Sequence, residues 1–244
     1  MLQTLLYVLY FFVTLILTLI IYLPYLVLKL LKLQKSADAY IGVIVPAWGR
    51  NIIWTTGSRV TVTGLENLPQ DRAVCFISNH QGNFDIPMIV GELRRKIGFV
   101  AKIELAKVPI LVLWMKALDC IIIDRKKAHQ SLKMVQKGIR SVHEGRNMLI
   151  FPEGTRSQSA RMGSFKAGGL QMAIRAGVPI VPLTVNGCYR ILEEKGRIHR
   201  SDLTLHVHPV IETASLGKQE QEALPQKIYK QIASKLPSVS EESK

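Results

Sequence analysis

Cysteine is scarce in this chain of 244 residues. Only Cys75, Cys120 and Cys188 occur, and each lies in or beside an apolar run. Their odd number and the lack of metal-site spacing disfavour a disulfide framework and a thiolate metal site. None neighbours a histidine or helix start that would activate a thiol, so a cysteine nucleophile is not expected. The pattern predicts reduced, mostly buried thiols in a protein or domain that faces the cytosol.

Acidic residues are also few. Asp and Glu number 18 against 32 Lys and Arg, which gives a net charge of +14 and a pI near 9.8. This excess of positive charge favours anionic partners: nucleic acid, acidic phospholipid or a phosphorylated substrate. Nucleic acid is not expected among them, because the chain has no recognisable nucleic-acid motif and no platform of interleaved aromatic and basic residues.

Charge is missing altogether before Lys29. The stretch from Leu5 to Leu28 is nearly all apolar, in a chain whose mean hydropathy is +0.18. As a helix it would be about 36 Å long, more than the roughly 30 Å hydrocarbon core of a bilayer. A signal peptide is disfavoured, because the stretch lacks a basic start and a small-residue cleavage site. Pro24 leaves two arrangements open, a spanning helix and one that dips into a single leaflet and returns.

The residues after this stretch predict its orientation. Three lysines, at positions 29, 32 and 35, flank its end, and the positive-inside tendency places all that follows on the cytoplasmic side of an inner or plasma membrane. Residues 36–56 contain Trp48 and Trp54 and fit an interfacial helix, with an ordinary core helix as the alternative. Residues 1–58 are therefore predicted to form an apolar and amphipathic two-helix membrane anchor.

Residues 59–236 are predicted to form one α/β domain, followed by a disordered tail at 237–244 that is rich in Ser and Glu. Short apolar runs alternate with segments of helical period, which indicates a mostly parallel or mixed sheet flanked by helices. The expected strands are 60–63, 73–78, 97–101, 120–123, 147–151, 178–185 and 203–208, and the expected helices are 86–95, 105–118, 128–143, 165–175 and 218–236.

Two of these strands carry residues with a positional meaning. The prolines of 178–185 suit a sheet edge or the start of a strand. His206 and His208 share one side of the last strand, and no third metal ligand is evident near them. Both histidines are therefore predicted to be surface residues rather than a metal site.

The loop after strand 73–78 carries the first chemical signal. It places His80 and Asp85 together, before a segment that looks like a helix. A histidine acts as a base of defined tautomer when a carboxylate holds its other ring nitrogen. These two residues are the candidate catalytic pair. The alternative is that Asp85 only caps the helix and that His80 is an ordinary polar residue.

A second signal follows strand 147–151, where the chain reads FPEGTRS at 151–157. Backbone N–H groups freed at a glycine turn, together with the guanidinium of Arg156, suit a phosphate or a carboxylate. Lys102 and Arg125 also follow strands. If these strands are parallel, the three cations lie along the same rim as His80, since the carboxyl ends of parallel strands share one edge.

These motifs resemble those of the glycerolipid acyltransferases. Asn79–Asp85 matches their NHx4D motif, FPEGTRS matches their third block, and VPIVP at 178–182 matches the fourth. The sequence IDR at 123–125 matches the end of the second block, although Asp119 stands where the family usually has Gly. The blocks cover roughly residues 76–185, and the short chain with its apolar start is most similar to the bacterial 1-acylglycerol-3-phosphate acyltransferases.

The resemblance implies a reaction that yields phosphatidic acid. His80 would remove the proton from the sn-2 hydroxyl of 1-acylglycerol 3-phosphate (lysophosphatidic acid) as it attacks an acyl thioester, and Asp85 would stabilise the charged imidazole. Such general-base help is worth about 10²–10⁴ in rate. No G-x-S-x-G elbow occurs, so no acyl-enzyme is expected. The thioester, acyl-CoA or acyl-acyl-carrier-protein, is a substrate, and no metal or other cofactor is implied.

The resemblance also assigns the binding residues. Lys102 and Arg156, and more weakly Arg125, would bind the substrate phosphate, while Glu153, Gly154 and Thr155 would form the acceptor-binding loop. Bracing of the turn is the alternative role for Glu153. Another lysophospholipid, an ornithine lipid or glycerol 3-phosphate remains an alternative acceptor. From a different class, a non-catalytic membrane-binding module remains an alternative function.

Overall fold

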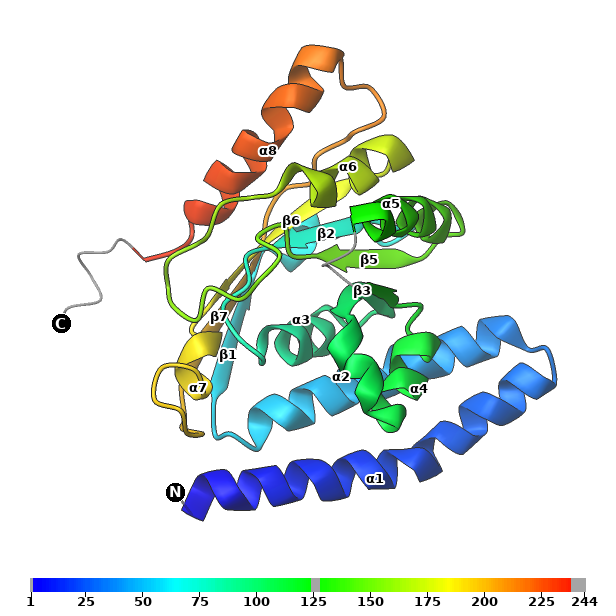
Figure 1. Cartoon of the computed structure of the whole chain (residues 1–244), viewed down its shortest axis with the longest axis vertical. Coiled ribbons are helices and arrows are strands. Elements are labelled where there is room, and N and C mark those ends of the chain that lie inside the picture. The colour runs from blue at the N-terminus through cyan, green and yellow to red at the C-terminus, as the bar shows by residue number, and fades with distance from the viewer. Residues whose placement is uncertain (1, 124–127, 238–244) are drawn as a thin grey trace.

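A seven-stranded mixed sheet forms the centre of the protein (Figure 1). The structure is a computed structural model that describes residues 2–123 and 128–237, apart from the side chains of 128–135, 167–169, 171 and 172. From residue 238 on, the predicted tail lies outside the described residues. The strands are β1 (Arg59–Thr63), β2 (Cys75–Ser78), β3 (Ile97–Lys102), β4 (Ile121–Ile123), β5 (Asn147–Ile150), β6 (Ile180–Asn186) and β7 (Asp202–Val207), in the spatial order β1-β7-β6-β2-β5-β3-β4.

All neighbouring strands are parallel except β6 and β7. Strand β2 is buried along its whole length, as parallel strands covered by helices on both faces are. Its Ile77 pairs with Ile150 of β5 on one side and with Pro182 of β6 on the other. The carboxyl ends of β2, β3, β4, β5 and β6 therefore share one edge, where a loop after any of them meets the others.

Helices cover both faces of the sheet (Figure 1). Alternate β2 residues point to opposite faces. Phe76 packs in a core shared with α2 (Gln34–Trp54), α3 (Asp85–Leu93) and α4 (Pro109–Ala117). Cys75 and Ile77 pack in a core shared with α6 (Ala167–Ala176) and α8 (Lys218–Ala233). The helical segments of the domain are η1 (Leu65–Asn67), α3 (Asp85–Leu93), η2 (Ile103–Lys107), α4 (Pro109–Ala117), α5 (Ala128–His143), α6 (Ala167–Ala176), α7 (Cys188–Ile191) and α8 (Lys218–Ala233).

Two long helices precede the sheet, α1 (Leu2–Leu30) and α2 (Gln34–Trp54). One face of α1 packs on the domain, where Thr18 accepts a hydrogen bond from the Trp114 indole at 2.9 Å. The rest of α1 exposes a continuous apolar surface that includes Leu9 and Ile20. Helix α1 is long and apolar enough to cross a membrane, and it is a candidate membrane anchor.

Helix α2 packs directly against α3, so it has the buried face of a core helix. Two glycines allow the close approach: a Cβ on Gly49 would collide with the α3 backbone, and a Cβ on Gly91 would lie 2.9 Å from the backbone nitrogen of Arg50. At the end of α2, Trp54 is exposed. The helix therefore combines a packed face with an exposed tryptophan.

Two expectations from the sequence are wrong. The run 178–185 is not a sheet edge, because β6 lies between β7 and β2. Pro179 directly precedes β6, as the strand-start alternative expects, whereas Pro182 lies inside the strand. Pro182 is tolerated there because its partner, His208, lies just past the end of β7; the Pro182 carbonyl accepts the His208 N–H at 3.0 Å, and only the return bond is missing. His208 is not a surface residue but is buried, with Nε2 2.7 Å from Thr184 Oγ1.

Candidate active site

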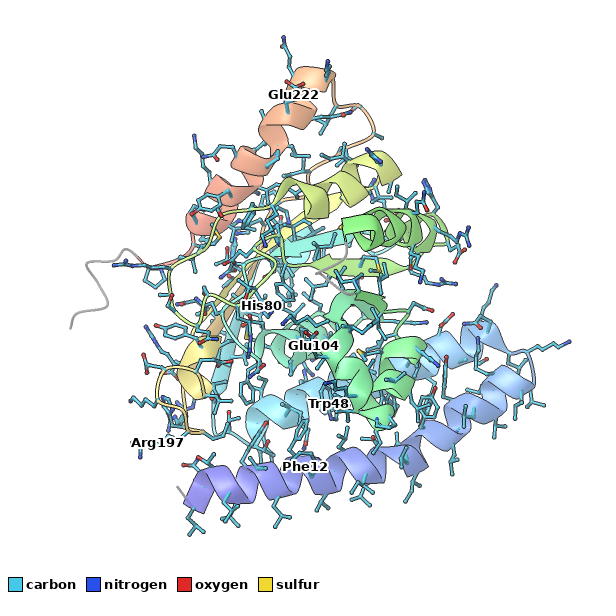
Figure 2. All side chains as sticks on the ribbon, viewed as in Figure 1. Phe12, Trp48, His80, Glu104, Arg197 and Glu222 are labelled. Carbon is cyan, nitrogen blue, oxygen red and sulfur yellow. The ribbon has the colours of Figure 1, made fainter. Side chains whose placement is uncertain are left out.

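The loop between β2 and α3 is fixed to the neighbouring strand β6. The Asn79 side chain donates to the Val185 carbonyl and accepts the Val185 N–H, both at 2.9 Å. The Gln81 side-chain oxygen accepts the Gly187 N–H at 2.8 Å. We call residues 79–84 the histidine loop. These bonds hold both sides of His80, so the histidine backbone has a defined place at the carboxyl edge of the sheet (His80 in Figure 2).

His80 and Asp85 form a hydrogen-bonded pair. The His80 Nδ1 lies 2.7 Å from Asp85 Oδ2, and the same oxygen accepts the N–H groups of Gln81 at 2.6 Å and Gly82 at 2.9 Å. The Asp85 side chain is fully buried. It makes no capping hydrogen bond to α3, so the helix-cap alternative is wrong. Asp85 is the first residue of α3, and its carboxylate points back into the histidine loop.

Among the residues that the structure describes, the imidazole of His80 has a hydrogen-bond partner on Nδ1 and none on Nε2. With Nδ1–H donating to the carboxylate, Nε2 carries the lone pair. The ring stacks on Phe151, with centroids 3.9 Å apart and planes 17° apart, and the side chain is 16% exposed. The ring is thus held by a hydrogen bond at one edge and by an aromatic face, while solvent reaches the site. This is the arrangement that a general base requires.

The FPEGTRS segment clamps the backbone of His80. Glu153 Oε1 accepts the His80 N–H at 2.7 Å, and the Ser157 N–H donates to the His80 carbonyl at 2.8 Å. Glu153 Oε2 accepts the Gly163 N–H at 2.8 Å. Burial of Glu153 raises the pKa of its carboxyl, against the lowering effect of these two N–H donors. By accepting these two N–H groups, Glu153 braces the turn. Gly154 supplies the left-handed conformation that the turn needs, with φ +73°.

The structure brings one predicted cation to the histidine loop. Arg156 Nη1 donates to the Asn83 side-chain oxygen and lies 3.2 Å from Glu193 Oε1. Lys102 ends β3, which β5 separates from β2; its side chain is 57% exposed and lies 3.9 Å from Glu104. Thr155 is exposed. Arg125 lies outside the described residues.

Comparison with known proteins agrees with these motifs. The family model described as Acyltransferase matches residues 59–186. The chain belongs to the acyltransferase family. The 1-acyl-sn-glycerol-3-phosphate acyltransferase of Borreliella burgdorferi is 30% identical over 77% of this chain and 75% of that protein. The "Probable 1-acyl-sn-glycerol-3-phosphate acyltransferase" of Mycoplasma pneumoniae is 34% identical over 62% of this chain, which spans 58% of the length of that relative.

A solved structure has the same fold. The crystal structure of the 1-acyl-sn-glycerophosphate (LPA) acyltransferase of Thermotoga maritima matches this acyltransferase with a TM-score of 0.82. The two chains are 24% identical, and the match covers 96% of this chain and 94% of that one. The likeness therefore extends beyond the family-model region to the N-terminal helices.

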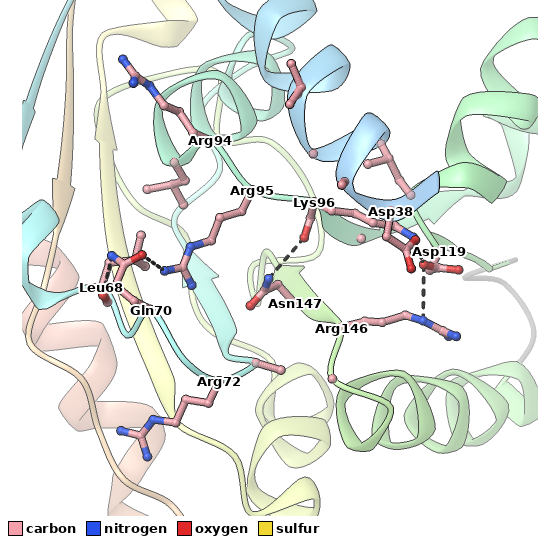
Figure 3. Close-up of a pocket in the computed structure, with 18 of the residues that line it drawn as sticks. Asp38, Leu68, Gln70, Arg72, Arg94, Arg95, Lys96, Asp119, Arg146 and Asn147 are labelled. Carbon is pink, nitrogen blue, oxygen red and sulfur yellow. Dashed lines mark hydrogen bonds and ion pairs between the residues drawn. The ribbon is translucent and has the colours of Figure 1, made fainter. Parts of the chain in front are cut away.

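The acyltransferase keeps the glycine-type turn before β4 although Asp119 replaces the usual glycine. Asp119 adopts φ +58°, and aspartate is one of the few other residues that tolerate this region. Its carboxylate pairs with Lys96 at 2.6 Å and Arg146 at 3.4 Å. These residues line a groove at the opposite edge of the sheet, where the strands begin (Figure 3), so this groove is remote from His80.

Two residues of the site were not predicted from the sequence. Asn83 and Glu193 both contact Arg156, and Glu193 also accepts the Asn83 N–H at 2.7 Å. Glu193 lies 110 positions from Asn83, just after α7 and beyond the region that the family model matches. It stands in the charged run Glu193–Lys195, which is typical of a solvated loop, so no local signal marks it.

Proposed function

We propose that this acyltransferase transfers an acyl chain from acyl-CoA or acyl-acyl-carrier-protein to the sn-2 hydroxyl of 1-acylglycerol 3-phosphate, giving phosphatidic acid. The observation that carries the proposal is the His80–Asp85 hydrogen bond, which leaves Nε2 without a partner in the described part of the chain. The names of the relatives from Borreliella and Mycoplasma agree with this acceptor.

The chemistry needs one base and one thioester. His80 Nε2 takes the hydroxyl proton while the oxygen attacks the thioester carbonyl carbon, and Asp85 stabilises the imidazolium that forms. The tetrahedral intermediate then collapses and the carbon–sulfur bond breaks. The imidazolium gives its proton to the departing thiolate, which leaves as the thiol and restores the neutral base. The donor is a substrate, and these steps use no metal or redox cofactor.

Binding of the acceptor is assigned to the cations of this edge. Arg156 suits a phosphate because its planar fork meets two oxygens at once. Lys102, at the end of β3, would add charge. Arg125, which follows β4 in the sequence, would do the same. Gly154 and Thr155 complete the acceptor-binding loop, with Glu153 as its brace.

The N-terminal helices would hold this site at the bilayer. The acceptor carries an acyl chain that dissolves in the membrane and a phosphate at its surface, which suits an enzyme anchored by α1. Lys29, Lys32 and Lys35 favour the cytoplasmic side for the α/β domain. The net charge of +14 adds attraction to anionic lipid and to an acidic acyl carrier protein.

The test is an acyl-transfer assay on purified membranes with a panel of acceptors and both donors. The panel contains 1-acylglycerol 3-phosphate, other lysophospholipids, a lyso-ornithine lipid and glycerol 3-phosphate. We expect a preference for 1-acylglycerol 3-phosphate and a loss of about 10²–10⁴ in His80→Ala. His143→Ala, an exposed histidine at the end of α5, is the matched control. Unchanged transfer by His80→Ala would refute the mechanism, and no transfer by wild type would favour a non-catalytic module.

A further inference from the structure

Glu193 has a buried carboxylate that contacts both the histidine loop and the FPEGTRS segment (the two motif loops). It follows α7, and its side chain is only 6% exposed. One oxygen, Oε1, accepts the Asn83 N–H at 2.7 Å and lies 3.2 Å from Arg156 Nη1. A carboxylate is costly to bury unless a cation and hydrogen-bond donors compensate its charge, and Arg156 and Asn83 supply both here.

The second oxygen of Glu193 lies against the histidine loop. Oε2 is buried and has no hydrogen-bond partner among the residues that the structure describes. A Cβ on Gly82 would lie 2.7 Å from it, so any side chain at position 82 would push this carboxylate away. The position of Glu193 is therefore set by close packing on Gly82 as well as by its hydrogen bonds.

Each pair among Arg156, Asn83 and Glu193 is in contact. The guanidinium donates to the Asn83 side-chain oxygen, and Glu193 holds both the guanidinium and the Asn83 backbone. Both contacts that the guanidinium makes with described residues run through Nη1. An arginine has five N–H donors, so within this part of the chain the Nε and Nη2 groups are left for a ligand. Two such donors match two oxygens of one phosphate.

We propose that Glu193 is a positioning residue that fixes the Arg156 guanidinium beside the histidine loop, so that it receives the phosphate monoester of the acceptor. This inference rests on the proposed function. Glu193 lies outside the four sequence motifs, and the group that it positions would bind an acceptor with a terminal phosphate. Glu193 acts through Arg156 and does not itself touch the reacting atoms.

The experiment compares Glu193→Gln with Arg156→Ala and with the double variant. Glutamine keeps the shape of Glu193 and an oxygen for the Asn83 N–H but removes the charge that holds Arg156. We expect Glu193→Gln to raise KM for 1-acylglycerol 3-phosphate about tenfold with kcat within about twofold. This is the signature of lost binding that is equal in the ground state and the transition state. In the Arg156→Ala background the same change should add no further rise, because the group it positions is gone.

Glu194→Gln is the matched control. This neighbour is 39% exposed, lies 3.9 Å from His199 and should leave KM and kcat unchanged. Melting temperatures identify a variant that is merely destabilised. Glu193→Asp keeps the charge, so its KM should lie between that of Glu193→Gln and that of the wild type.

The outcomes separate the two proposals. An equal KM rise with and without Arg156, or a fall in kcat alone, would overturn the positioning role. If Arg156→Ala raises KM and Glu193→Gln does not, only this inference fails. If Arg156→Ala leaves KM unchanged, the phosphate-binding part of the proposed function fails with it.

Discussion

Replacing Asp85 with asparagine removes one negative charge from the histidine loop and keeps the shape of the side chain. Asp85 Oδ2 accepts three N–H groups, from His80 Nδ1, Gln81 and Gly82. Two of these donors belong to the buried backbone and need an oxygen, so the amide oxygen of the asparagine should take the Oδ2 position. Nδ1–H of His80 then still has an acceptor, and the tautomer with the lone pair on Nε2 is kept.

The expected loss of kcat follows from the negative charge that Asp85→Asn removes. A hydrogen bond to a charged group is worth about 1.5–3 kcal/mol, and the imidazolium formed during the reaction would lose its bond to a carboxylate. At about 1.36 kcal/mol per factor of ten, Asp85→Asn should lower kcat about 10- to 150-fold. Asp85→Ala is less informative, because it would also leave two buried backbone N–H groups without an acceptor.

The assay is initial-rate release of CoA with 1-acylglycerol 3-phosphate and acyl-CoA, alongside the melting temperature of each variant. Asp71→Asn, in an exposed loop, is the control and should behave as wild type. A kcat for Asp85→Asn within about twofold of wild type would refute the idea that Asp85 stabilises a charged His80. A melting temperature lowered by many degrees would assign the loss to folding instead.

Two further predictions concern stability. Gly49→Ala should destabilise the fold by about 1–3 kcal/mol, because its Cβ would collide with the α3 backbone, whereas Gly42→Ala on the same helix has open space and should be neutral or stabilising in urea unfolding. Burial lowers the pKa of His208 from 6.5 to about 4, so the unfolded chain binds a proton that the folded chain does not. The free energy of unfolding should therefore fall by on the order of 2 kcal/mol between pH 7 and pH 4.5 on account of this residue. His208→Gln should remove that part of the pH dependence, and an undiminished slope would contradict the assignment.

The strands of the sheet were predictable, because parallel strands buried on both faces appear as short apolar runs. All seven runs correspond to strands in the structure, with ends that differ by a few residues. Segment 105–118 divides at Pro109 into η2 and α4, since proline is suited to the first turn of a helix. The four-residue helix α7 was not predicted, because one turn has no periodicity to detect.

Strand order and register were not predictable, and they decide the burial of single residues. The proline rule placed 178–185 at an edge or at a strand start, yet Pro182 lies inside a central strand. Only one of its hydrogen bonds is lost, because the β7 ladder ends there. His208 follows β7 in the sequence as a polar residue, yet it is buried. Its partner Thr184 also donates to the Ile232 carbonyl of α8, which packs against β6. Such contacts depend on elements that meet only in the folded chain.

The same limit applies to the site. His80 and Asp85 are five positions apart, so one loop can join them, and the local sequence suffices to pair them. Arg156 and Glu193 reach this loop from two other segments, and nothing near Glu193 in the sequence distinguishes it from a solvated acid. The position of Lys102 at the carboxyl edge of the sheet was predicted correctly, because the carboxyl ends of parallel strands share one edge. This rule does not predict how near the Lys102 side chain comes to His80.

The two motif loops depend on each other, and the sheet explains how. They are separated by about 70 residues, yet β2 and β5 are adjacent and parallel, with Ile77 opposite Ile150 at their ends. The FPEGTRS segment therefore starts beside His80 and bonds to both its N–H and its carbonyl. A base gains from such fixed geometry because little reorganisation remains when the proton moves. We infer that the buried carboxylate of Glu153, although its pKa is raised by burial, serves chiefly to hold the backbone of His80 in place.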